Sequence, residues 1–235
     1  MKNLHKFTTQ TECNSAKLKT PNLCFVEENR NVFSNITNDY VDLGLPSGIK
    51  WAKCNIGAEN ETDYGLYFQV GATVGYTDSE VKPHSYWSTL PGNLGAPTGQ
   101  YSYLLNWNKA NTTNGVLNTS VDAAYANTNG GAKIPTVTDI NELVDNTNIS
   151  WTTINNVTGR KFTNKKDSSK YIFIPASGYG YNSDPHSGGN TYIMSSSTYS
   201  NPKGWYFFSF NESSCSKISE WMDRPYAVCV RGIKA

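Results

Sequence analysis

Cysteine is the most reactive side chain that this sequence offers to an active site. Five are present, at Cys13, Cys24, Cys54, Cys215 and Cys229. No CxxC motif and no Cys/His cluster with zinc-binding spacing occurs. The pair of interest is Cys215 with Cys229, which lie on either side of an expected loop between two C-terminal strands. Because a usable thiolate needs an electropositive neighbourhood, we expect buried, reduced thiols that pack as small hydrophobes.

Acidic and histidine side chains give no stronger sign of catalysis or metal binding. Glu220 and Asp223 lie on either side of Trp221 and are interpreted as surface carboxylates in a loop, with an acid pair as the alternative. The histidines, at His5, His84 and His186, each lie in a polar stretch. No Asp-rich loop supplies the roughly six to eight oxygen ligands of calcium, and no GxSxG, HExxH or Walker motif occurs. We therefore expect no catalytic residue, no metal and no cofactor, and the protein is not expected to be an enzyme.

Aromatic side chains offer a different chemistry, which is recognition. The region from Tyr76 to Asn129 combines Gly, Pro, Asn and Ser with a set of aromatic residues: Tyr86, Trp87, Tyr101, Tyr103 and Trp107. Flat aromatic faces suit sugar rings, and an exposed aromatic cluster needs a reason to exist. These residues are candidate glycan contacts that would work without calcium. The alternative, which holds for any single aromatic residue, is packing in the interior.

Composition limits the elements that can hold such residues. Hydrophobic residues make up 37% and charged residues only 17%, so most of the polarity comes from Asn, Thr, Ser and Gly. These residues are weak helix formers and favour short strands joined by polar turns. The net charge is +1, and the Lys and Arg residues are scattered and form no basic stripe that could bind nucleic acid. No run of 18 apolar residues spans a membrane, and the N-terminus lacks the apolar region of a secretory signal.

The N-terminal part of the chain predicts a helix followed by a hairpin. Thr9 and Glu12 fit a capping box, which would start a helix over roughly residues 10–18. A strand-like run follows at Asn22–Glu27, and Val32 with Phe33 would form the returning arm. Such a unit is too small to bury a core of its own.

Several apolar residues of residues 1–38 have no other obvious burial: Phe7, Leu18, Leu23, Phe25, Val26 and Phe33. We expect them to anchor the chain on a partner surface and to form the contact between subunits of a homo-oligomer, with a trimer as the expected state. The alternative is an arm that packs on its own domain.

The body, residues 39–235, alternates strand and turn signals around one clear helix. Two strands joined by a Pro-Ser-Gly turn are expected over Tyr40–Trp51, and another strand over Tyr64–Gly71. Thr136 caps a helix in which Asp139 lies near the positive end of the dipole. The apolar face of this helix consists of Ile140, Leu143 and Val144. Later strands are expected at Ser150–Asn155, Gly159–Thr163, Tyr171–Pro175, Tyr192–Ser196, Trp205–Asn211 and Tyr226–Arg231.

These segments resemble, in order, the Fibrobacter succinogenes major paralogous domain. The opening motif is Tyr40–Ala58, and the others are Tyr64–Phe68, Ile134–Thr136, Glu142–Leu143, Ser150–Thr153, Ile172–Tyr179, Tyr192–Ser197 and Val228–Gly232. The resemblance covers about residues 40 to 235 and implies an α+β, C-type-lectin-like fold, with a mixed and antiparallel sheet and long loops. Ile193 stands where the family usually has Trp, and Cys229 and Gly130–Pro135 also depart from its pattern, so we expect rearranged core packing.

The leader is similar to that of structural proteins of crAss-like phages, over His5–Glu12 and Pro21–Glu27. This likeness implies a virion protein made in the host cytoplasm without a signal peptide and carried on the capsid exterior, as a head fibre or capsid decoration. Its expected partners are its own copies, a capsid or capsid-associated protein, and host-surface or mucus glycans, but neither nucleic acid nor membrane. The alternative is a glycan-binding cell-surface protein of a gut Bacteroidetes bacterium. An oxidase-like enzyme of related fold is disfavoured because the segments around Cys215 and Cys229 do not resemble that enzyme.

Overall fold

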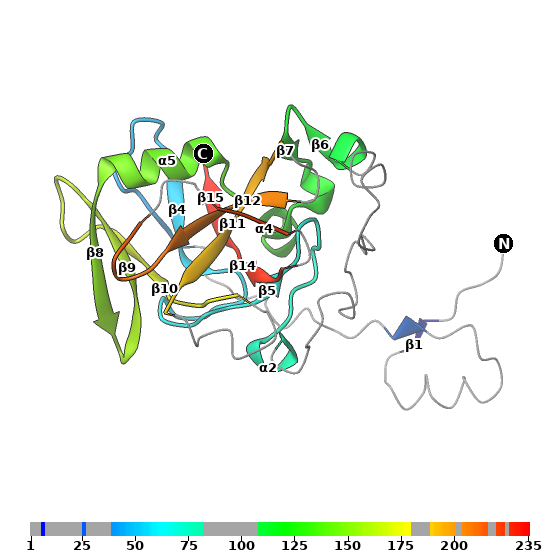
Figure 1. Ribbon diagram of the computed structural model, residues 1–235, viewed down its shortest axis with the longest axis horizontal. Helices are drawn as coiled ribbons and strands as arrows, with labels where there is room; N and C mark the ends of the chain where they lie inside the picture. The colour runs from blue at the N-terminus through cyan, green and yellow to red at the C-terminus, as the bar shows by residue number, and fades with distance from the viewer. Residues whose placement is uncertain are drawn as a thin grey trace. The chain divides into compact units, whose positions relative to one another are not determined.

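The computed structural model describes residues 39–81, 108–179, 189–200, 204–215 and 226–235, and the backbone alone of residues 6–7, 25–26 and 220–223 (Figure 1). The chain divides into two units, Met1–Ile36 and Thr37–Ala235, and the second unit is called the body below.

In the first unit, β1 (Lys6–Phe7) pairs in parallel with β2 (Phe25–Val26). The strand predicted around Phe25 is therefore present, but its described partner precedes it and is not the returning arm of a hairpin. The predicted helix over residues 10–18 and the returning arm at Val32 and Phe33 lie outside the described residues.

The body is α+β and rich in strands, as predicted. Its first strands are β3 (Tyr40–Val41), β4 (Lys50–Asn55), β5 (Tyr67–Phe68), β6 (Thr112–Thr113) and β7 (Val116–Leu117). The later strands are β8 (Thr147–Ile154), β9 (Val157–Asn164), β10 (Tyr171–Pro175), β11 (Thr191–Thr198), β12 (Gly204–Phe210), β13 (Glu220–Asp223), β14 (Val228–Cys229) and β15 (Arg231–Lys234). The helical elements are α2 (Asp78–Val81), η3 (Thr119–Val121), α4 (Ala123–Asn127) and α5 (Val137–Asn146).

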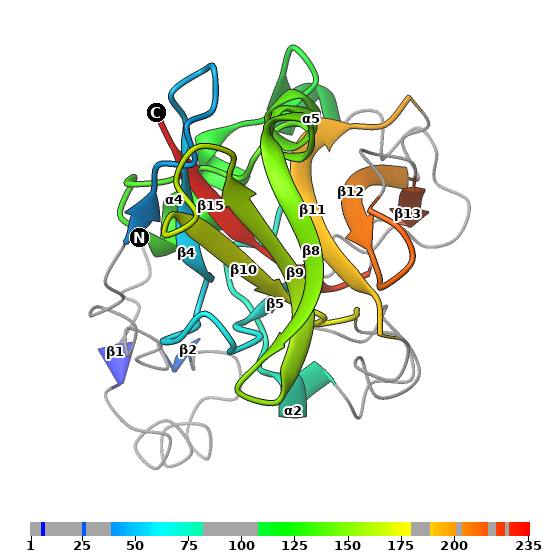
Figure 2. The same cartoon turned by 90° about the vertical axis from the view of Figure 1, so that its left-hand side faces the viewer.

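The strands of the body form three sheets (Figure 2). The largest has the order β13-β12-β11-β14-β5, with β7 on β11 and β6 on β7. The other two have the orders β10-β9-β8 and β15-β4-β3. The closing segment of the chain joins two of them, since β14 lies in the large sheet while β15 pairs antiparallel with β4.

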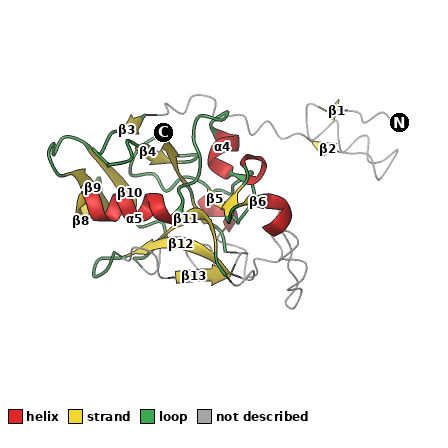
Figure 3. Ribbon diagram, turned by 90° about the horizontal axis from the view of Figure 1, so that it is seen from above, coloured by secondary structure: helices red, strands yellow, loops and turns green. Residues whose placement is uncertain are grey.

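Helix α5 begins where the sequence predicts. The Thr136 side chain accepts a hydrogen bond from the Asp139 backbone N–H (3.2 Å), and the Asp139 carboxylate accepts one from the Thr136 N–H (2.8 Å). This capping box satisfies two amides that the first turn leaves without partners. Ile140 and Leu143 are buried against the core, and Val144 packs beside them. Figure 3 shows α5 as the long helix next to β11.

The three sheets bury one hydrophobic core between them. Trp51, Phe162 and Ile233 come from different strands and are fully buried in the same cluster. The Phe162 ring lies 5.9 Å from that of Phe208 and 6.1 Å from that of Phe210. Tilted and edge-to-face pairs of this kind each contribute roughly 0.5–1.5 kcal/mol beyond their buried area.

The strand predictions hold for most of the body, with two errors. The strand expected over Tyr226–Arg231 is divided into β14 and β15, which lie in different sheets. The segment Glu220–Asp223 was expected to be a loop but forms β13, paired antiparallel with β12. The charged residues at both ends of this segment are not typical of a strand. Strand preference depends on the packing context, and pairing with Trp205 and Tyr206 of β12 stabilises β13. The strand Tyr171–Pro175 has the predicted bounds.

Candidate functional site

Three tyrosines meet at one end of the large sheet, and we call Tyr179, Tyr192 and Tyr226 the tyrosine cluster. Tyr192 is the second residue of β11. Tyr226 precedes β14, which runs parallel to β11 and pairs Cys229 with Ile193. Tyr179 follows Gly178, which forms a parallel bridge with Thr191. The sheet thus brings together residues from three separate segments.

Tyr179 is the centre of this cluster. Its ring centroid lies 4.9 Å from that of Tyr192 and 5.6 Å from that of Tyr226, and both pairs are edge-to-face, at 84°. Such contacts are favourable and hold each ring in one orientation. All three residues are partly exposed.

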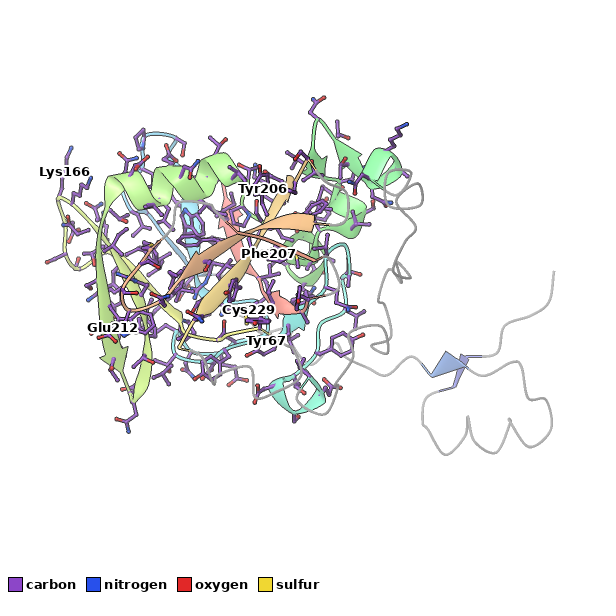
Figure 4. All side chains as sticks on the ribbon, viewed as in Figure 1. Tyr67, Lys166, Tyr206, Phe207, Glu212 and Cys229 are labelled. Atoms are coloured by element: carbon purple, nitrogen blue, oxygen red, sulfur yellow. The ribbon has the colours of Figure 1, made fainter. Side chains whose placement is uncertain are left out.

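Hydrogen bonds beneath the tyrosine cluster fix the backbone that carries it. The Tyr67 hydroxyl donates to the Ser177 carbonyl at 2.7 Å, and the Gly178 N–H donates to the Asn190 carbonyl at 2.8 Å. The Asn211 amide then donates to the Asn190 side-chain oxygen at 3.1 Å. Figure 4 shows Tyr67 beside Cys229, where β5 pairs with β14. These bonds tie Gly178, which precedes Tyr179, and Asn190, which lies shortly before Tyr192, to neighbouring segments.

This arrangement can bind but offers little for acid–base chemistry. Partly exposed rings provide apolar contact, and phenolic hydroxyls can donate and accept hydrogen bonds. Among the residues that the structure describes, no group of three or more His, Cys, Asp or Glu side chains could hold a metal ion.

The cysteine prediction can be checked at three positions. Cys54, Cys215 and Cys229 are free, so the pair Cys215 and Cys229 is not bonded. Burial raises the pKa of Cys229 to about 12, and its thiol donates to the Tyr64 carbonyl at 3.1 Å. Burial also raises the pKa of Cys215, although Arg160 opposes the shift. Both thiols therefore stay protonated at neutral pH, and Cys229 packs in the core as a small hydrophobe, as expected.

The most deeply buried charge belongs to Arg231, the arginine of the closing motif. Its Nε donates to the Asn55 side chain at 2.8 Å, and Nη2 donates to the Phe173 carbonyl at 2.9 Å. Nη1 donates to the carbonyls of Ala52, at 3.0 Å, and Lys53. Desolvation lowers the pKa of this guanidinium to about 10. Because it links β15 with β4 and β10, Arg231 is a structural residue.

The structure describes only some of the site residues predicted from the sequence. The aromatic set, Tyr86, Trp87, Tyr101, Tyr103 and Trp107, lies outside the described residues. Of the anchor set, Phe7, Phe25 and Val26 have a described backbone in β1 and β2, and Leu18, Leu23 and Phe33 lie outside. Sequence reasoning missed the tyrosine cluster. A usable signal existed, since Tyr179 ends one family-like motif, Tyr192 begins another and Tyr226 shortly precedes the last.

Comparisons with protein-family models, with curated proteins and with solved structures find no match to this chain. Among the described residues, no helix is both long and apolar enough to cross a membrane.

Proposed function

We propose that this chain is a structural protein of a phage virion, a head fibre or capsid decoration, whose C-type-lectin-like body binds glycans. The order of the family-like motifs along residues 40 to 235 supports the lectin-like body. The strand-rich α+β architecture and the capped helix α5 agree with that fold. The similarity of the leader to structural proteins of crAss-like phages supports the virion.

The observation that carries the binding function is the tyrosine cluster. Tyr179, Tyr192 and Tyr226 keep part of their surface exposed although they contact one another. Sugars present flat C–H faces with hydroxyls at their edges, which match aromatic rings that carry hydroxyl groups. Rigid tyrosines lose little conformational entropy on binding, which makes them effective contact residues. The ligand class that fits is a neutral glycan, bound without calcium.

A glycan-binding assay with matched variants tests this function. The full-length chain would be screened against host-surface and mucin glycans with and without EDTA, and then as Tyr192→Ala. The control is Tyr206→Ala, which removes a partly exposed tyrosine of β12 that makes a similar edge-to-face contact with Tyr199, at 5.1 Å. We expect Tyr192→Ala to weaken binding about tenfold, as for a contact residue at the centre of an interface, and Tyr206→Ala to leave it unchanged.

Three results would count against the proposal: no glycan bound by the wild-type chain, binding abolished by EDTA, or equal losses in the two variants. Thermal unfolding of both variants shows whether a loss of binding reflects a loss of structure. Immunogold labelling of phage particles distinguishes a virion protein from a bacterial surface protein, because only the former decorates capsids.

The N-terminal unit Met1–Ile36 is proposed as the anchor on the capsid and as the contact of a homotrimer. Deletion of residues 1–35 should leave a folded body that no longer enters particles. Light scattering on the full-length chain should give the mass of an oligomer. Normal incorporation of the truncated chain, or a monomer at micromolar concentration, would exclude this role.

A further inference from the structure

Strand β8 forms the outer edge of the sheet β10-β9-β8, and no strand among the described residues pairs with its other side. In Figure 1 the β8–β9 hairpin lies at the margin of the body. Its register runs through consecutive pairs from Thr147 with Asn164 to Ile154 with Val157, without a bulge. The edge is therefore long and regular.

The turn of this hairpin determines which backbone groups point outward. Asn155 and Asn156 have φ values of 48° and 64°, as a two-residue type I′ turn requires. In such a hairpin Ile154 and Val157 exchange hydrogen bonds, and every second pair before them does the same. The N–H and C=O groups of Ile149, Trp151 and Thr153 consequently point away from β9, at the open edge.

Edge strands in natural proteins usually carry a device that prevents pairing with another chain, such as a lysine, a proline, a bulge or a covering segment. The sequence of β8, TNISWTTI, contains no charged residue and no proline. Other edge strands do carry such residues: β13 contains Glu220 and Asp223, β15 contains Lys234 and β10 ends at Pro175. Strand β8 has β-branched and aromatic residues that favour pairing, and within the strand itself there is no charge, proline or bulge to prevent it.

We propose that β8 pairs with β8 of a second copy of this chain, in antiparallel orientation, to form a continuous six-stranded sheet. Self-pairing fits because an uncharged strand opposes its own copy without repulsion. The two-fold axis would pass at Trp151, so that Ile149 of each copy lies opposite Thr153 of the other. Trp151 packs partly against the core of its own chain, and the Arg160 guanidinium lies 5.7 Å from its ring.

A self-paired edge closes as a dimer, because both copies use the same surface. The contact is thus separate from the homotrimer proposed for the N-terminal unit and independent of glycan binding. It would join two chains, or two trimers, through their bodies.

Adjacent threonines give a matched test. Thr153 and Thr158 lie directly opposite each other and are both exposed, but only Thr153 is on the open edge. Thr153→Lys places a charge next to the partner strand, while Thr158→Lys places the same charge on the inner strand β9. Thr153→Pro removes one outward N–H and leaves the ladder with β9 intact. The masses of the full-length wild type and of the three variants would be measured by sedimentation velocity.

We expect the wild-type assembly to fall to half its mass in Thr153→Lys and Thr153→Pro and to keep its mass in Thr158→Lys. Circular dichroism should show all three folded, and Thr153→Pro keeps the test valid if Thr153→Lys is unstable. A wild-type monomer at micromolar concentration would overturn the proposal. So would an unchanged mass in both Thr153 variants, or an equal loss in Thr158→Lys.

Discussion

The closing segment of the chain contributes to two regions of opposite character. At one end Tyr226 joins the tyrosine cluster, whose rings stay partly exposed. A few residues later Arg231 is fully buried, and its guanidinium donates to backbone carbonyls of β4 and β10 and to Asn55. The first region holds apolar surface in contact with water, and the second holds a charge away from it. Each arrangement costs free energy unless something offsets it, but the offsets differ.

For Arg231, hydrogen-bond acceptors of the chain offset the cost of burying the charge. The acceptors of Arg231 named above are uncharged oxygens of the chain, so the guanidinium is solvated by the protein in place of water. At the tyrosine cluster, the edge-to-face contacts cover only part of the rings. The Arg231 contacts therefore serve stability, whereas binding is the function proposed for the tyrosine cluster, and the following variants separate these two properties.

The largest effect is expected for Arg231→Ala. Removal of the guanidinium leaves the oxygens of Asn55 and Phe173 buried without this donor, and it also opens a cavity. Each unsatisfied buried acceptor costs about 1–3 kcal/mol, so we expect a loss of about 3 kcal/mol or more in the free energy of unfolding. Urea unfolding of wild type and variant measures it. Arg231→Lys should recover only part of the lost free energy of unfolding, because an ammonium group cannot reach the same acceptors at once. A change below about 1 kcal/mol would show that the contacts are dispensable.

Arg160→Ala should have a smaller and more local effect. The Arg160 guanidinium donates to the carbonyls of Asn211 and Glu212 and lies over Trp151, but the side chain is 9% exposed, so water can replace part of what is lost. Hydrogen bonds from a charged donor contribute about 1.5–3 kcal/mol, and we expect a loss near the lower end of this range. Hydrogen exchange should increase at residues 211–215 before it increases at β4. Equal increases at both places would contradict a local role.

Local signals in the sequence predicted the elements, and long-range pairing decided the sites. The helix at Val137–Asn146 follows from Thr136, Asp139 and an apolar face within a few residues. The tyrosine cluster requires the parallel pairing of β11 with β14, which no local signal encodes. Arg231 could be recognised as part of a motif, but its acceptors are mostly backbone carbonyls, and the sequence does not show where those lie. Strand β13 was missed for the same reason, because its neighbour β12 stabilises it.

The pH dependence of stability should report the burial of Cys229. Its pKa is raised from 9.0 to about 12 by burial, so between these values the unfolded chain loses a proton that the folded chain keeps. The unfolded state then binds fewer protons, and stability falls as the pH rises, by up to about 1.4 kcal/mol per pH unit. Urea unfolding of wild type and Cys229→Ala between pH 8 and 10 isolates this contribution as a difference in slope. Equal slopes would mean that the thiol is accessible to water in the folded chain.

The smallest effect on stability, and the sharpest separation of the two regions, is expected for Tyr226→Phe. The change removes one hydroxyl and keeps the ring that contacts Tyr179 at 5.6 Å, so the free energy of unfolding should fall by no more than one net hydrogen bond, about 0.5–1.5 kcal/mol. If the hydroxyl bonds a glycan, binding should weaken about threefold to tenfold, which corresponds to one net hydrogen bond. Tyr206→Phe is the control, since Tyr206 lies on β12 in the separate pair with Tyr199. Isothermal titration and urea unfolding on the same preparations give both quantities. Lost stability with unchanged binding would place Tyr226 with the packing residues, and the distinction between the two regions would fail at that position.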